Sequence, residues 1–209
     1  MSVLDPIPLR RRRWWGWREW LLLLGALVLI VLLRKGQPDY DARVAPLLVH
    51  GHGLDRIEGR NFAIDVKGFK VAGAYLVAGD FSHPQPRQLK SSGVWLSVVG
   101  TLEALEKPGI ISARLQTRDG LFYDTSGSGR PKLDGVNLTD RFVAPGLPES
   151  GAYFFELPPD KLQGAHLQVY WGNLTPGLMD SLVDIDLGID AARARALLDE
   201  AEPVLDLRK

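Results

Sequence analysis

The feature that most limits the fold of this chain is an alternation of apolar and polar side chains with a period of two residues. In "NFAIDVKGFKV", Phe62, Ile64 and Val66 fall on one face, and Asp65 and Lys67 fall on the other. Successive side chains of a β-strand point to opposite faces, so this pattern predicts a strand with one buried face. About seven or eight such short strands, with hardly any helix, predict a mainly β protein, an antiparallel β-sandwich over residues 57–189. The alternation recurs in segments 94–102, 111–115, 152–155, 166–171 and 182–187.

Glycine and aspartate mark turns and irregularities between these strands. Gly68 is expected to form a β-bulge that shifts the phase of its strand. The pair Asp119-Gly120 is typical of a tight hairpin, because glycine readily adopts positive φ. Near the end of the chain, "DAARARALLDEAEP" predicts one short helix with Asp190 as its N-cap. Residues 190–209 are therefore assigned to a C-terminal helix and tail.

An apolar run near the start of the chain predicts a transmembrane helix at residues 14–35. Leu21–Leu33 carries no charged side chain. A helix of about 17 residues covers roughly 25 Å of the ~30 Å hydrocarbon core, and flanking cations extend its reach toward the headgroups. Tryptophans at one end favour the membrane interface. The side chains predicted at this interface are Arg10, Arg11, Arg12, Arg13, Trp14, Trp15, Trp17, Trp20, Arg34 and Lys35.

The distribution of cations around the apolar run predicts its orientation. The N-terminal flank is the more basic, so residues 1–13 are expected to form a cytoplasmic tail and the large domain to lie outside the cytoplasm. Residues 36–56, with Gly, Pro and scattered charges, are expected to form a stalk. A cleaved secretory leader is the alternative, but "LLRKG" lacks the small residues of a cleavage site. The sequence thus predicts a single-pass protein of the cell membrane, with the lipid bilayer as one partner.

Charge and cysteine content exclude several classes of function. Residues 1–37 carry seven Lys/Arg and two Asp/Glu, whereas the remainder carries 18 Lys/Arg and 23 Asp/Glu. An acidic body lacks the positive field that holds nucleic-acid phosphates, so no nucleic-acid partner is expected. The chain has no cysteine, which excludes disulfides, thiol catalysis and cysteine-ligated zinc or iron–sulfur sites.

Two groups of residues are weak candidates for metal binding, although no metal or other cofactor is predicted. His50 and His52 lie two residues apart with Asp55 nearby, and imidazole suits Zn²⁺ or Cu²⁺. Asp184 and Asp186 share one face of a predicted strand, and carboxylate oxygens suit Ca²⁺. Each pattern is also typical of a solvent-exposed loop or strand face, which is the favoured interpretation. Neither group has the spacing of an established metal motif.

Several segments, taken in order, resemble a known family. They are "GRNFAIDVKGFKVA", "GVWLSVVGTLEAL", "LQTRDGLFYDTS" and "FVAPGLPESGAYFFELPPDKLQGAHLQVY". Together they resemble the immunoglobulin-like extracytoplasmic domains of unknown function in Gram-positive and actinobacterial lipoproteins and membrane proteins, including a secreted mycobacterial antigen. The likeness runs from Gly59 to Leu187, although the family strand that ends in Asn reads "GTLEAL" here. It implies an outward-facing, immunoglobulin-like β-sandwich and carries over no catalytic residues.

The sequence contains no nucleophile elbow, Walker loop or dinucleotide fingerprint. No catalytic residue is therefore assigned, and enzyme activity is not expected. An anchored sandwich without such groups offers mainly strand edges and loops to other molecules. We expect a protein-interaction or accessory module of the cell envelope, with a membrane or envelope protein as partner. The alternatives are a domain that binds a ligand or metal through His50 and His52 or Asp184 and Asp186 and, less favoured, an anchored enzyme.

Overall fold

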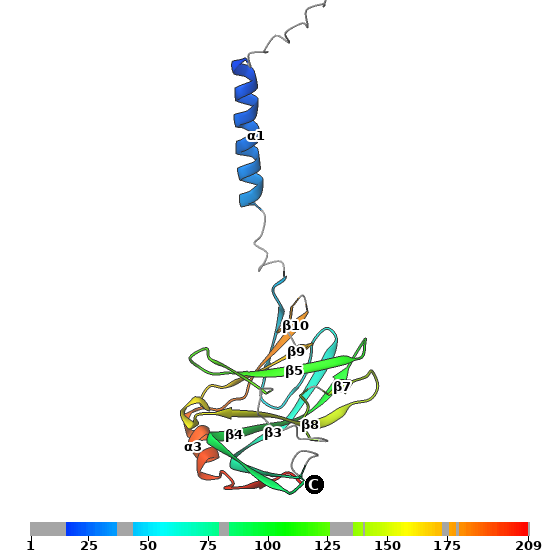
Figure 1. Ribbon diagram of the computed structural model, residues 1–209, viewed down its shortest axis with the longest axis vertical. Helices are drawn as coiled ribbons and strands as arrows, with labels where there is room; N and C mark the ends of the chain where they lie inside the picture. The colour runs from blue at the N-terminus through cyan, green and yellow to red at the C-terminus, as the bar shows by residue number, and fades with distance from the viewer. Residues whose placement is uncertain are drawn as a thin grey trace, which may run out of the picture. The chain divides into compact units, whose positions relative to one another are not determined.

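The chain forms two compact units, Met1–Arg43 and Val44–Lys209. The computed structural model, drawn in Figure 1, describes residues 16–36, 44–79, 84–125, 136–139, 141–172, 176–178 and 180–208. The described residues of the first unit form the helix α1 (Trp17–Lys35). The second unit holds every β-strand of the described residues.

Helix α1 exposes apolar side chains along its length, and none of its residues is buried. Charged residues occupy both of its ends, Arg18 and Glu19 at the start and Arg34 and Lys35 at the finish. Among the residues that the structure describes, no helix has both the length and the apolar character needed to cross a membrane. The structure therefore does not support the transmembrane helix predicted at residues 14–35. The remaining interface residues lie outside the described residues, namely Arg10, Arg11, Arg12, Arg13, Trp14 and Trp15.

The second unit consists of two β-sheets (Figure 1). One of them, sheet A, has the strand order β1-β10-β9-β5-β6, and β7 pairs with the first residues of β5. The antiparallel pairs of sheet A are β10–β9, β9–β5, β5–β6 and β5–β7, whereas β1 runs parallel to β10. Its strands are β1 (Leu47–His52), β5 (Gly109–Gln116), β6 (Phe122–Asp124), β7 (Phe142–Val143), β9 (His166–Trp171) and β10 (Ser181–Asp186).

The second sheet, sheet B, has the order β11-β3-β4-β8, and β2 also pairs with β3. Its pairs are antiparallel except that β11 runs parallel to β3. A 3-10 helix at Pro159–Lys161 and the helix α3 (Ala191–Asp199) lie outside the sheets. The strands of sheet B are β2 (Arg56–Glu58), β3 (Phe62–Val77), β4 (Arg87–Ala104), β8 (Glu149–Leu157) and β11 (Leu205–Asp206).

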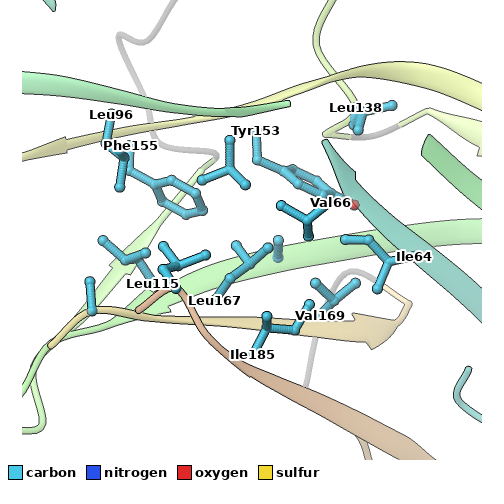
Figure 2. Packing of buried hydrophobic residues seen from close by; sticks show 14 of the residues in the cluster. Ile64, Val66, Leu96, Leu115, Leu138, Tyr153, Phe155, Leu167, Val169 and Ile185 are labelled. Atoms are coloured by element: carbon cyan, nitrogen blue, oxygen red, sulfur yellow. The ribbon is translucent and has the colours of Figure 1, made fainter. Parts of the chain in front are cut away.

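The main hydrophobic core lies between the two sheets. Figure 2 shows Leu96 and Phe155 of sheet B pointing toward Leu115 and Leu167 of sheet A. Burying each such side chain contributes about 1.5–3 kcal/mol relative to leaving it in water. Tyr153 is also buried here, and its hydroxyl donates a hydrogen bond to the Ile111 carbonyl across the core, 2.9 Å away. This burial raises the pKa of the Tyr153 hydroxyl.

Local sequence signals agree with the structure at several positions. The register between β3 and β4 shifts at Gly68, as expected for a β-bulge. Gly120 has φ +82° in the hairpin that joins β5 to β6, a conformation that favours glycine. Asp190 caps α3 by accepting a hydrogen bond from the Arg193 amide at 2.7 Å. The alternating faces predicted for β3, β4, β5, β8, β9 and β10 are likewise confirmed by their buried residues.

Strand β1 falls within residues 36–56, the segment predicted as a stalk. Leu47 pairs with Ser181, and the parallel register continues to His52. Gly51 allows a close approach to β2, because a Cβ at this position would lie 1.8 Å from Ile57 Cδ1. The local pattern did not indicate this strand, since its partner is distant in sequence and its own glycine and histidines interrupt the apolar alternation. The second unit accordingly begins at Val44.

Candidate functional site

Three of the four histidines of the chain lie on β1 and β9, the two strands that flank β10 in sheet A. His50 is opposite Asp184, and His52 is opposite Asp186, across the β1–β10 pair. His166 of β9 faces Asp186 from the other side of β10. The two candidate groups that were separate in the sequence are therefore neighbours in the fold. We call His50, His52, His166, Asp184 and Asp186 the histidine–aspartate cluster.

The imidazoles of the cluster approach the aspartate carboxylates from both sides of β10. His166 Nδ1 lies 3.2 Å from Asp184 Oδ1, and His50 Nδ1 lies 3.7 Å from Asp184 Oδ2. His52 Nδ1 is 4.0 Å from Asp186 Oδ2. The Asp184 side chain is only 15% exposed, whereas the His50 and His52 side chains are 68% and 84% exposed. Asp184 is thus the most buried of these three side chains, and the two histidines of β1 are largely exposed to solvent.

The alternation of the strands fixes the direction of these side chains. Ile185 is buried in the core between the sheets, so Asp184 and Asp186 point to the outer face of sheet A. Val49 of β1 packs against the same core, which places the two histidines of β1 on the outer face as well. The core side chains therefore hold both strands in the register that forms the cluster.

A polar network continues the cluster across the next strands of sheet A. Gln168 is 6% exposed and donates a hydrogen bond to Gln116 Oε1 at 2.7 Å. The side-chain oxygen of Gln168, Oε1, accepts a hydrogen bond from Arg114 Nε at 2.8 Å. The Arg114 guanidinium lies 3.9 Å from the centre of the Phe122 ring, and burial lowers the pKa of this guanidinium. Charged, amide and imidazole groups thus extend over four strands of one sheet face, namely β1, β10, β9 and β5.

A solvent-open hollow of about 600 Å³ adjoins the cluster. Segments from β5, β9, β10 and the loop before α3 contribute to its lining, and most of the lining residues have polar side chains. Such a hollow suits polar groups of a ligand or of a partner side chain more than a large apolar molecule. The groups relevant to recognition are Gln116, Arg118, His166, Asp184, Asp186 and Asp190.

A smaller hollow of about 320 Å³ lies next to the first, around the β5–β6 hairpin. Here Asp119 accepts hydrogen bonds from Lys161 Nζ at 2.7 Å and from the Thr117 hydroxyl at 2.6 Å. The Lys161 hydrogen bond, followed by that of Thr117, lowers the pKa of the Asp119 carboxyl. The same pair raises the pKa of Lys161. This ion pair is exposed, so it orients the hairpin rather than forming a buried charge site.

The structure unites most of the candidate metal ligands of the sequence but not all of them. Asp55 is exposed in the segment between β1 and β2, outside the cluster. In their present side-chain positions, no three ligating groups of the described residues are placed to hold one metal ion. The sequence pattern did not single out His166 as a ligand, because only the register of β9 against β10 brings this residue to Asp184. The alternation of "AHLQVYWG" did place His166 on the face opposite the core residues.

The two facing sheets and their shared core define the second unit as a β-sandwich of a mainly β protein. No family model and no curated protein matches the chain. Solved structures with a similar fold include an uncharacterized β-sandwich protein from Clostridium difficile 630, with 9% identity and a TM-score of 0.40, which covers 72% of this chain and 99% of its own.

Two further solved structures show a comparable likeness. The yjhA protein from Bacillus subtilis has 14% identity and a TM-score of 0.43, covering 66% of this chain and 100% of its own. A conserved hypothetical protein from Bacillus anthracis has 12% identity and a TM-score of 0.38, covering 61% of this chain and 94% of its own. At these identities the likeness concerns the β-sandwich fold alone.

Proposed function

We propose that the protein is a membrane-anchored, immunoglobulin-like β-sandwich that faces outside the cytoplasm and binds a protein partner of the cell envelope. The observation that carries the binding role is the polar hollow of about 600 Å³ beside the histidine–aspartate cluster. The sandwich has its own core between the sheets, so the outer face of sheet A is available for contacts with other molecules. Recognition sites are usually concave, and convergent polar groups in them fix the orientation of the bound molecule.

The anchoring role is supported by the surface of α1. Its apolar side chains between Leu21 and Leu33 are 46–74% exposed, which is costly in water and favourable in lipid. The uncharged part is short for a bilayer, and the cations at both ends would extend toward the headgroups. The excess of arginine before α1 favours a cytoplasmic N-terminus and an external sandwich.

Membrane attachment and orientation are tested together in cells that express the full chain. We expect the protein to remain in the membrane fraction after carbonate washing and its sandwich to be degraded when protease is added to intact cells. Substitution of Leu24, Leu27 and Val31 by Asn should release the chain from the membrane. A soluble wild-type protein, or a sandwich protected from external protease, would refute the anchored arrangement.

The binding role is tested by site-specific photo-cross-linking in the same cells. A photoreactive residue at Arg118, on the rim of the hollow, should give a discrete cross-linked product. The same residue at Lys90, which is exposed on β4 of sheet B, is the matched control. The product at position 118 should be lost when Asp186 is replaced by Asn. Equal labelling at both positions, or none at position 118, would contradict recognition through this hollow.

A further inference from the structure

The histidine–aspartate cluster brings together three imidazoles and two carboxylates from β1, β9 and β10. We propose that it binds one transition-metal ion of the Zn²⁺ class, with His50, His166 and Asp184 as ligands. His52 and Asp186 form the adjoining pair, and Asp186 is the register partner of His166. This inference does not depend on the partner proposed above, because metal binding is measured on the protein alone.

The distances around Asp184 match those between ligands of a single ion. Zinc binds imidazole nitrogen and carboxylate oxygen at about 2.0–2.2 Å, so two ligands of one tetrahedral ion lie about 3.4 Å apart. His166 Nδ1 and His50 Nδ1 lie 3.2 and 3.7 Å from the two oxygens of Asp184. Ligating nitrogens must be unprotonated, so metal binding would replace the present His166–Asp184 contact with bonds from both groups to the ion.

Only exposed side chains have to move to complete the site. No three ligands of the described residues surround a common point as the side chains now stand. Asp184 is sheltered and held by its strand, whereas the His50 side chain is 68% exposed and the His52 side chain 84% exposed. These two imidazoles are therefore free to change rotamer toward β10 without disturbing the core.

The ligand types select the class of metal. Three imidazoles outnumber the two carboxylates of the cluster, and imidazole suits Zn²⁺, Cu²⁺ and Ni²⁺. Calcium takes six to eight oxygen ligands and is poorly matched by such a set. Joining the two candidate groups therefore favours Zn²⁺ or Cu²⁺ over Ca²⁺ at the aspartates.

Metal binding at this place has a structural consequence for β1. This strand is at one end of the strand order of sheet A and pairs with β10. An ion held by His50 of β1, Asp184 of β10 and His166 of β9 would link three strands across the sheet. Backbone amides of β1 should therefore exchange with solvent more slowly when the metal is bound.

The test uses the full chain in a mild detergent, without a polyhistidine tag and freed of metal by chelation. Titration with ZnCl₂ should show one ion per chain, confirmed by elemental analysis after dialysis. His50→Ala and Asp184→Asn should each weaken Zn²⁺ binding at least tenfold. His83→Ala, which removes the remaining histidine, and Asp65→Asn, on β3 of sheet B, are the matched controls and should bind as the wild type does.

Several outcomes would overturn the metal site. Failure to bind stoichiometric Zn²⁺ would refute the site and leave the cluster with its imidazole–carboxylate contacts alone. Undiminished binding by His50→Ala, or an equal loss with His83→Ala, would place the ion elsewhere. Displacement of the ion by millimolar Ca²⁺ would contradict imidazole ligation. The thermal midpoint of each metal-free variant is measured in parallel, to separate loss of the site from loss of folding. His52 is the more exposed of the two β1 histidines, so His52→Ala gives a second variant that is not expected to disturb folding.

Discussion

The two outer faces of the sandwich differ in polarity and in whether other segments of the chain cover them. The outer face of sheet A carries the histidine–aspartate cluster and its polar network, open to solvent at the hollow. The outer face of sheet B carries a second apolar cluster built from Tyr75, Trp95 and Phe154. The C-terminal residues Leu205 and Leu207 pack against this cluster. Among the described residues, the outer face of sheet B is thus closed by the C-terminal segment, whereas the outer face of sheet A exposes His50 and His52 to solvent.

This difference shows how the strand pattern distinguishes a covered face from an open one. Strand β4 has apolar residues on both faces, with Leu96 in the main core and Trp95 in the outer cluster. The second half of strand β10 alternates, with Ile185 in the core and Asp184 and Asp186 outside. A strand that is apolar on both faces therefore indicates a second layer, here the end of the chain. A strand that alternates indicates a face that meets water or a ligand.

The largest expected effect comes from breaking the covered face at Trp95. Its ring centre lies 5.1 Å from that of Tyr75, and it is 5% exposed. We expect Trp95→Ala to lower the free energy of unfolding by about 3–5 kcal/mol, measured by urea denaturation followed by circular dichroism. Trp95→Phe should cost far less, because Trp95 Nε1 has no hydrogen-bond partner among the described residues. Equal losses of unfolding free energy in the two variants would show that burial of aromatic ring area is not the main contribution of Trp95.

A smaller effect is expected when the cover of this face is removed. Deletion of residues 203–209 takes away the apolar contacts of Leu205 and Leu207 and the Leu207 amide hydrogen bond to the Leu76 carbonyl, 2.9 Å long. We expect a loss of about 2 kcal/mol and faster amide exchange at the end of β3. The double variant Leu205→Ala/Leu207→Ala keeps the backbone bonds and should lose less. An unchanged stability after deletion would mean that these residues do not seal the cluster.

On the outer face of sheet A, the buried Gln168 should contribute more to the free energy of unfolding than the exposed histidines. Gln168→Ala leaves Arg114 Nε and Gln116 Oε1 without their partner, so we expect a loss of about 1–2 kcal/mol. Gln168→Glu keeps the acceptor but removes the donor, and it should weaken only the contact with Gln116. Both variants are compared by urea denaturation. A loss below the experimental error for Gln168→Ala would mean that solvent replaces the network.

The exposed histidines should contribute almost nothing to stability in the absence of metal. Exposed imidazole–carboxylate pairs are worth less than about 1 kcal/mol, so His50→Ala and His52→Ala should each change the metal-free stability by less than about 0.5 kcal/mol. The same variants would then differ from the wild type mainly in Zn²⁺ binding. A large destabilisation of the metal-free protein would show that these histidines stabilise the packing of β1 even without a metal ion.

The smallest effect concerns the pH dependence near the hairpin of β5 and β6. The hydrogen bonds of Lys161 and Thr117 lower the pKa of Asp119 in the folded state. Its contribution to stability is therefore present above the pKa of the unfolded chain and is lost as pH falls through the lower folded pKa. Between pH 7 and pH 3, Asp119→Asn should lose slightly less stability than the wild type, measured from urea midpoints. A steeper loss of stability with falling pH in Asp119→Asn than in the wild type would contradict a lowered pKa of Asp119 in the folded state.

The sequence predicted the parts of the fold that depend on local periodicity and turn chemistry. Phe62, Ile64 and Val66 face the core as their spacing indicates, and Asp190 caps its helix. The cluster could not be predicted, because it depends on which strands become neighbours and in which register. His166 and Asp184 approach each other only through the pairing of β9 with β10. The hollow depends in the same way on loops that meet at one end of sheet A.

The parallel pairing of β1 with β10 also sets the order in which the sandwich is completed. Leu47 enters the domain first but has to wait for Ser181, which is synthesised near the end. At about 5–20 residues per second, this delay is on the order of ten seconds, and it is long compared with hairpin formation. Strand β1 is therefore a late addition to sheet A during synthesis, and it stays without its β10 partner until that strand has been made.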